Sequence, residues 1–143
     1  MGYSLAYPRD WHVTSRVVAT EFASDAQCES VQIIDSGPPP ESGSIAVVLR
    51  SFVQVCRRPV ADGSTLSQFM RRTYGEQLRL FESTELGGHS AFRTKSREAD
   101  TTIFVQTDVH RLQVVASVNT DARMQPQRLR EVQDILDSFS FIR

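Results

Sequence analysis

The segment from residue 80 to 118 constrains the fold more than any other part of the chain, because its apolar residues alternate with polar ones over successive runs. Alternation with a period of two is typical of β-strands that bury one face. Two-residue turns at Gly87-Gly88, Ala99-Asp100 and His110-Arg111 would join these runs. The segment is therefore predicted to form an antiparallel meander.

These turns define a register for the predicted meander. Strict antiparallel pairing gathers one apolar set on a common face, with Ile103 opposite Val118, Val105 opposite Ala116, Thr107 opposite Val114, Val109 opposite Leu112, and Phe81 and Phe92 beside them. The other face receives Glu82 across from Arg93, Lys95 across from Phe104, and Gln106 across from Val115. This outer face is mostly polar with two apolar residues, so it is either partly covered or binds something.

Strand patterns also precede the meander. Tyr3, Leu5 and Tyr7 alternate with smaller residues before Pro8, which should end the first strand, and Trp11 is expected to fold over that aromatic face. Further strands are expected near residues 18–22, 31–34 and 44–55. Residues 36–43 contain three consecutive prolines and are expected to form an extended loop.

Two segments have the spacing of amphipathic helices. The stripe of the first comprises Leu66, Phe69, Met70, Tyr74 and Leu78, with Asp62 or Ser64 as a cap and Gly75 near the last turn. The stripe of the second comprises Leu129, Val132, Ile135, Leu136 and Phe139, with Pro126 in the first turn. The expected fold class is therefore α+β, an antiparallel sheet of about six to eight strands flanked by helices. One domain is expected to span residues 1–143.

Composition and charge exclude few functions but lower the expectation of nucleic-acid binding. The net charge is −1, and Lys95 is the only lysine among scattered arginines. Arg93, Lys95 and Arg97 form a basic row on one predicted strand, which could meet an acidic partner or a phosphate. A solvated face is the favoured interpretation, because Glu82 lies opposite Arg93 and interleaved aromatic residues are few.

The cellular compartment is left open by the sequence. No apolar run approaches the roughly 20 residues of a spanning helix, and no leader pattern precedes Tyr3. The chain is expected to be cytoplasmic as written, or exported if a leader has been removed. Cys28 and Cys56 could pair after export, although two thiols are favoured for a chain without a visible leader.

No group of residues indicates a reaction. His12, His89 and His110 lack a second ligand at the spacing of a zinc site. No serine lies in a nucleophile-elbow pattern, and Glu82 and Glu85 project from opposite faces of their strand. The chain is therefore expected not to be an enzyme and to need no cofactor or structural metal. A weak metal site at a histidine is the alternative.

Three short motifs resemble a known family. The opening Tyr-Ser-Leu-Ala-Tyr-Pro-Arg-Asp-Trp (3–11) is similar to the aromatic strand, proline and tryptophan that begin PsbP-like domains. Leu-Gly-Gly-His-Ser-Ala (86–91) resembles their hairpin, and Ile-Leu-Asp-Ser-Phe-Ser-Phe (135–141) resembles their closing helix and last strand. The resemblance, which extends to DcrB-like proteins and small bacterial lipoproteins, implies an α-β-α sandwich with binding or assembly roles. It carries no catalytic residues onto this chain.

The sequence thus favours a non-catalytic protein-binding or assembly domain. Its expected partner surface is the outer face of the meander, comprising Arg93, Lys95, Phe104 and Val115. A protein partner is expected, without nucleic acid and without a membrane span. The alternatives are a DcrB-like, secretion-associated chaperone and a small-ligand or metal-binding domain of an exported lipoprotein. In the ligand-binding case, a pocket lined by Tyr3, Tyr7 and Trp11 is conceivable, although such a trio is usually core.

Overall fold

The computed structural model describes residues 2–19, 27–35, 50–60, 63–95 and 100–142. Seven strands form one antiparallel sheet in the order β2-β3-β4-β8-β7-β6-β5. Their bounds are β2 His12–Ala19, β3 Gln27–Ile34, β4 Phe52–Pro59, β5 Phe81–Leu86, β6 His89–Thr94, β7 Asp100–Gln106 and β8 His110–Ser117. The prediction of an α+β fold with an antiparallel sheet flanked by helices is confirmed.

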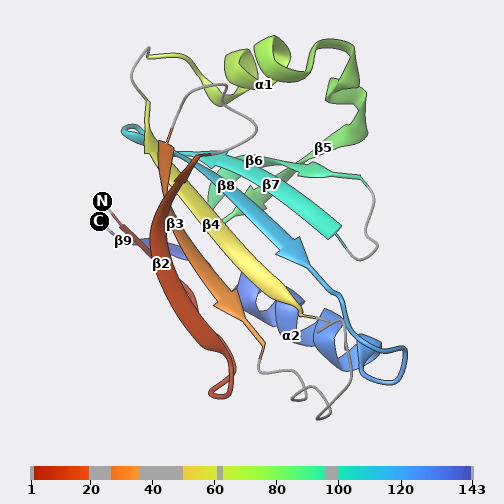
Figure 1. Ribbon diagram of the computed structural model, residues 1–143. Coiled ribbons are helices and arrows are strands. Elements are labelled where there is room, and N and C mark those ends of the chain that lie inside the picture. The colour runs from red at the N-terminus through yellow and green to blue at the C-terminus, as the bar shows by residue number, and fades with distance from the viewer. Residues whose placement is uncertain (1, 20–26, 36–49, 61–62, 96–99, 143) are drawn as a thin grey trace.

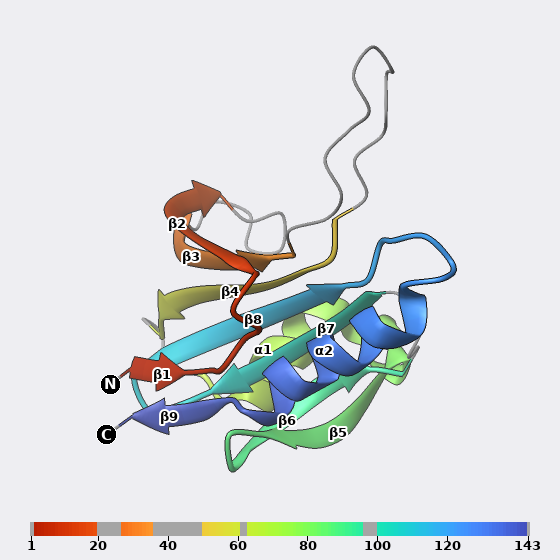
Figure 2. The same cartoon turned by 90° about the horizontal axis from the view of Figure 1, so that it is seen from below.

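The remaining elements cover the two faces of this sheet. Helix α1 (Leu66–Tyr74) and the 3-10 helix η1 (Gly75–Leu80) lie on one side, and α2 (Gln125–Asp137) lies on the other (Figure 1). Strands β1 (Gly2–Ser4) and β9 (Ser140–Ile142) pair with each other and bring the two termini together beside α2 (Figure 2). The sheet is therefore the middle layer of three.

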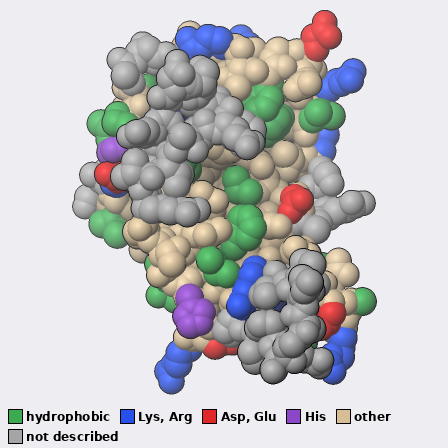
Figure 3. Space-filling view, viewed as in Figure 1, with side chains coloured by type: hydrophobic (Ala, Val, Ile, Leu, Met, Phe, Trp, Pro, Cys, Tyr) green, Lys and Arg blue, Asp and Glu red, His purple; other side chains and the backbone are tan. Residues whose placement is uncertain are grey.

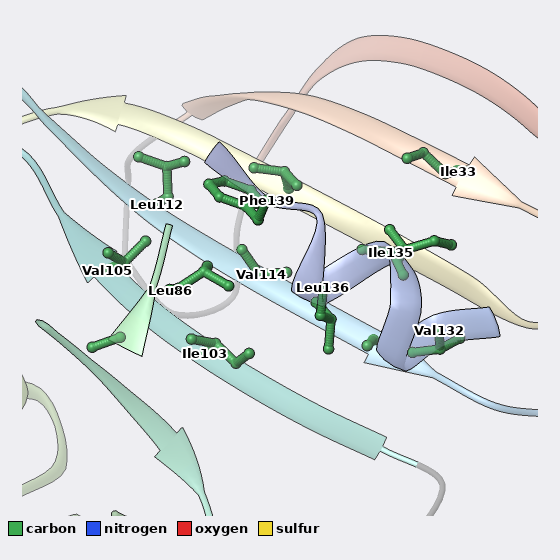
Figure 4. Packing of buried hydrophobic residues seen from close by; sticks show 14 of the residues in the cluster. Ile33, Leu86, Ile103, Val105, Leu112, Val114, Val132, Ile135, Leu136 and Phe139 are labelled. Carbon is green, nitrogen blue, oxygen red and sulfur yellow. The ribbon is translucent and has the colours of Figure 1, made fainter. Parts of the chain in front are cut away.

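The main core lies between the sheet and α2 (Figure 4). Sheet residues such as Val105 and Val114, both fully buried, meet Val132 and Ile135 of α2. Burial of such branched side chains contributes about 1.5–3 kcal/mol each. Trp11 joins this core at 3% exposure. The predicted helical stripe is confirmed there except for Leu129, which is 39% exposed.

A second, smaller core lies between the sheet and α1. Phe69, Met70 and Phe104 are buried in it, and Tyr74 and Phe92 pack against them. The helix begins at a capping box: Thr65 Oγ1 accepts from the backbone N–H of Gln68, whose Oε1 accepts from that of Thr65. Thr65 is the cap, so the predicted caps at positions 62 and 64 were one to three residues early. Gly75 ends α1 with φ of 53°, as expected of a C-terminal glycine.

The predicted register holds in one hairpin and fails in the next two. Glu82 pairs with Arg93 as predicted, across a turn at Gly87-Gly88. Ile103 pairs with Val114 instead of Val118, which is a shift of four residues. An even shift leaves every side chain on its predicted face, so Ile103 still points inward. Val109, predicted inward, is instead 50% exposed in the turn.

The shift between β6 and β7 has a larger effect. Phe104 pairs with Phe92, and not with Lys95 as predicted, so the shift is three residues. An odd shift exchanges the two faces of β6 relative to β7. Phe92 therefore lies on the α1 face with Phe104, whereas Arg93 lies opposite Ile103 on the α2 face. Gln106 of β7 pairs with Arg111 of β8 and not with Val115, which is the same four-residue shift as for Ile103.

Several predictions fall wholly or partly outside the described residues. The proline loop at 36–43, Arg97 of the basic row and Ala99 of a proposed turn lie wholly outside, as do the end of the strand at 18–22 and the start of the strand at 44–55. The described part of the 44–55 prediction is β4, which begins at Phe52 and continues to Pro59. The first strand is shorter than predicted, since β1 ends at Ser4. The preference for two free thiols was wrong, because Cys56 is disulfide-bonded.

Candidate functional site

The four residues of the predicted partner surface do not form one patch. Phe104 is 2% exposed, and its ring lies 5.8 Å from both Phe69 and Tyr74. It lies on the predicted outer face, but its expected exposure to a partner was wrong, because α1 and η1 cover that part of the sheet. Arg93 lies on the opposite face, and Lys95 is exposed just after β6, where its N–H donates to Leu80 O. Val115 alone remains half-exposed on the α1 side of the sheet.

Val115 lies on the α1 side of the sheet, but outside the small core that packs under α1. Ile34 of β3 pairs directly with Phe52 of β4, and both are half-buried on the same face as Val115. We call these three residues the open sheet patch. Hydrophobic side chains reach the surface in the middle of this face (Figure 3). The patch therefore places apolar surface on strands at the centre of the sheet.

Polar residues surround the open sheet patch. Gln54, which pairs with Val115, donates from Nε2 to Ser30 Oγ over 2.9 Å. Ser117, beside Phe52 on the neighbouring strand, donates to Asp100 Oδ1 over 2.6 Å. An apolar centre with a polar rim is the usual composition of a protein interface. The sequence signal for the two residues missed was the pairs Ile33-Ile34 and Phe52-Val53, since adjacent apolar residues on a strand face opposite sides.

A cleft of about 580 Å³ lies at the other end of the same face. Its floor comes from β5 and β6, including Ser83, Ser90 and Phe92. Its walls come from the first turn of α1 and from the end of β7. Fourteen described residues line it, and seven of them are serine or threonine. The aromatic residues of the predicted pocket do not line this cleft. Tyr3 and Trp11 pack into the main core, and Tyr7 is exposed.

The wall of this cleft is held by a set of hydrogen bonds. Gln106 donates from Nε2 to the backbone oxygen of Ser64 over 2.8 Å, and accepts at Oε1 from Arg111 Nε over 2.9 Å. Arg111 also donates from Nη2 to Ser64 Oγ over 3.1 Å. Its guanidinium lies 4.0 Å from the ring centre of Phe69, a cation–π distance. These contacts join β7, β8 and α1 at the start of the helix.

A buried ionic network lies on the α2 side. Arg128 Nε lies 2.9 Å from Asp35 Oδ2, and Arg128 Nη1 donates to Glu131 Oε1 over 2.9 Å. Trp11 Nε1 donates to Glu131 Oε2 over 2.8 Å. Asp35 is 2% exposed, and its Oδ1 accepts from the backbone N–H of Ser51. The geometry is that of a structural tie between α2 and the strand ends, because Asp35 and Arg128 are both almost fully buried against each other.

The histidines are dispersed. His12 is exposed at the start of β2, whereas His89 packs its ring 4.5 Å from that of Phe141. Burial, and then the positive charge of Arg57, hold the pKa of His110 below its usual value. Within the described ranges, no three residues of the His, Cys, Asp and Glu types are grouped to hold a metal ion. No described helix has the length and apolar character needed to cross a membrane.

Comparisons with known proteins add no relative. No family model, curated protein or solved structure matches this chain.

Proposed function

We propose that this protein is a non-catalytic protein-binding or assembly domain, PsbP-like in architecture, that engages a protein partner through the open sheet patch. The observation that carries the proposal is the half-exposure of Ile34, Phe52 and Val115 on central strands. Antiparallel sheets with a solvated face normally place polar residues there. Contiguous apolar surface with a polar rim is typical of interaction sites. The layering of helices on both faces supports the PsbP-like resemblance.

A matched pair of substitutions tests this proposal. Phe52→Glu places a charge in the patch, whereas Leu129→Glu places one on the exposed side of α2, on the opposite face. Each variant and the parent chain would be used as bait in an extract of the source cells, with quantitative mass spectrometry. A partner recovered by the parent and by Leu129→Glu but lost with Phe52→Glu is expected. Equal recovery by all three chains would refute the patch as the interface.

Phe104→Glu is unsuitable for this purpose. Its side chain is buried under α1, and a buried unpaired charge would unfold the domain whatever its partner. Thermal unfolding of Phe52→Glu must therefore accompany the binding assay. A change within about 0.5–1 kcal/mol of the parent is expected for a half-exposed position.

The disulfide at Cys56 favours an exported role over a cytoplasmic chaperone. Cys56 is disulfide-bonded, and the chain contains one other cysteine, Cys28, on the neighbouring strand β3. Structural disulfides persist in oxidising compartments and are rare in the cytosol. We therefore favour the lipoprotein-like alternative over the DcrB-like cytoplasmic one. Alkylation of thiols in intact cells, followed by mass spectrometry, tests this: labelled cysteines in the native protein would contradict export.

A further inference from the structure

We infer that the cleft between the start of α1 and strands β5 and β6 binds a neutral, polyhydroxylated ligand of the size of a disaccharide. This site is separate from the open sheet patch. The two lie at opposite ends of β7, with Asp100 beside the patch and Gln106 in the cleft wall. The inference therefore does not depend on the proposed protein partner.

The size of the cleft suits a small molecule. Its volume of about 580 Å³ falls in the range of about 300–1,000 Å³ found for ligand pockets. Two separate layers of the fold form it, namely the sheet and the α1 layer. A ligand seated there would contact residues far apart in sequence, because the lining runs from Val60 to Asp108.

The frame of the cleft is already organised. Both ends of the Gln106 amide are used within the protein, by Ser64 and by Arg111. The Thr65 hydroxyl caps α1, and the Thr107 hydroxyl bonds to the backbone of His110. These groups hold the walls in place and are not the ones expected to bind a ligand. Preorganised walls reduce the entropy that binding would otherwise lose.

The remaining polar groups are hydroxyls that lack partners. Ser67, Ser83 and Ser90 are exposed in the cleft, and within the described residues none of their side-chain hydroxyls has a hydrogen-bond partner. The first-turn N–H groups of Leu66 and Ser67 have no acceptor within α1. A hydroxyl both donates and accepts, so a row of them complements another row of hydroxyls. Phe92 adds an aromatic surface at the floor, against which the C–H groups of a sugar ring can pack.

The charge of the lining favours a neutral ligand over an anion. Among the described residues that line the cleft, Asp108 is the only ionisable one, and it is exposed. A helix N-terminus alone attracts anions. The Asp108 carboxylate opposes that attraction and can accept hydrogen bonds from ligand hydroxyls. The combination matches a sugar better than a phosphate.

NMR titration of the full chain tests the inference. Maltose, cellobiose and N,N′-diacetylchitobiose would each be added to ¹⁵N-labelled protein, to on the order of 50 mM, because weak sites bind in the millimolar range. Sodium phosphate at matched ionic strength is the competing probe. Ser90→Val and Ser83→Val remove cleft hydroxyls, and Ser15→Val on the exposed edge strand β2 is the matched control.

The expected result is a saturable shift of the Ser67, Ser83 and Ser90 amides with at least one disaccharide. Each cleft variant should weaken that binding about three- to tenfold, the effect of one lost hydrogen bond, and Ser15→Val should not. The inference is overturned if no disaccharide shifts these amides, or if phosphate shifts them and the sugars do not. It is also overturned if both cleft variants bind as tightly as the control.

Discussion

Replacing Arg128 with methionine tests the buried ionic network directly. Methionine keeps most of the unbranched aliphatic stem of arginine but removes the guanidinium. In the folded protein Arg128 is 8% exposed and lies between two carboxylates, those of Asp35 and Glu131. The substitution leaves the carboxylate of Asp35 without its positively charged partner, although this carboxylate is only 2% exposed.

The expected cost is about 3 kcal/mol of unfolding free energy. Removal of one partner from a buried ion pair costs about 3–5 kcal/mol, because the other charge is left without compensation. Two contacts place Arg128→Met at the lower end of that range. Asp35 keeps its hydrogen bond from the Ser51 N–H, and Glu131 keeps the one from the Trp11 indole.

Urea unfolding followed by tryptophan fluorescence provides the assay. Trp11 is the only tryptophan and lies within the network, so its emission reports both unfolding and local change. Arg130→Met, an exposed position on α2, is the control and should change stability by no more than about 0.5 kcal/mol. The double variant Asp35→Asn/Arg128→Met should be about 1–2 kcal/mol more stable than Arg128→Met alone, because it has no unpaired buried charge.

Two results would refute this reasoning. One is an Arg128→Met variant that unfolds within about 1 kcal/mol of the parent, since the pair would then contribute no more than a surface contact. The other is a double variant no more stable than Arg128→Met alone, because the cost would then not arise from Asp35.

Three further predictions concern single groups. Tyr74→Phe should leave stability unchanged or raise it by about 1 kcal/mol, because the Tyr74 hydroxyl is buried without a hydrogen-bond partner among described residues. The same burial raises the pKa of Tyr74 to about 12. A loss of more than about 1 kcal/mol in urea unfolding would contradict this prediction. Because burial and Arg57 lower the pKa of His110, its contribution to stability is present above pH 6.5, the usual value, and is lost as the pH falls below it. Melting curves between about pH 7.5 and 5 should fall less steeply for His110→Asn, and parallel curves would disprove the shift. Reduction of the disulfide at Cys56 should lower the free energy of unfolding by about 3–4 kcal/mol if that bond closes the loop to Cys28. Two free thiols in the intact, unreduced protein would exclude that bond.

The register of the meander could be predicted only where a turn has a strong local signal. Gly87 and Gly88 have φ of 58° and 81°, values that few other residues adopt, so Gly-Gly marked this hairpin reliably. The turn between β7 and β8 has no glycine. It comprises Asp108 and Val109, and the Thr107 N–H donates to His110 O across them. The sequence therefore contained no glycine signal that would place this turn at Asp108 and Val109.

The candidate sites were less accessible to sequence reasoning than the fold. Arg128 follows a proline in the first turn of a helix and resembles any exposed arginine on a polar face. Only the folded chain brings it to Asp35, more than ninety positions earlier in the sequence. The cleft is similar, because Ser67, Ser83 and Ser90 meet only after α1 has packed across the sheet. Contacts between distant segments have no local signature.

The burial of Phe104 could have been predicted from the helix count, although the predicted register of the meander pointed the other way. Two amphipathic helices need two apolar faces, since each stripe must be buried. The predicted outer face had only Phe104 and Val115, too little to receive the stripe of α1. The observed pairing supplies what was missing, because it brings Phe92 and Phe81 to Phe104 beneath the helix. Helix α1 and η1 then cover one half of this face. The apolar residues of the open sheet patch lie on the other half, where no helix of the described residues packs against them.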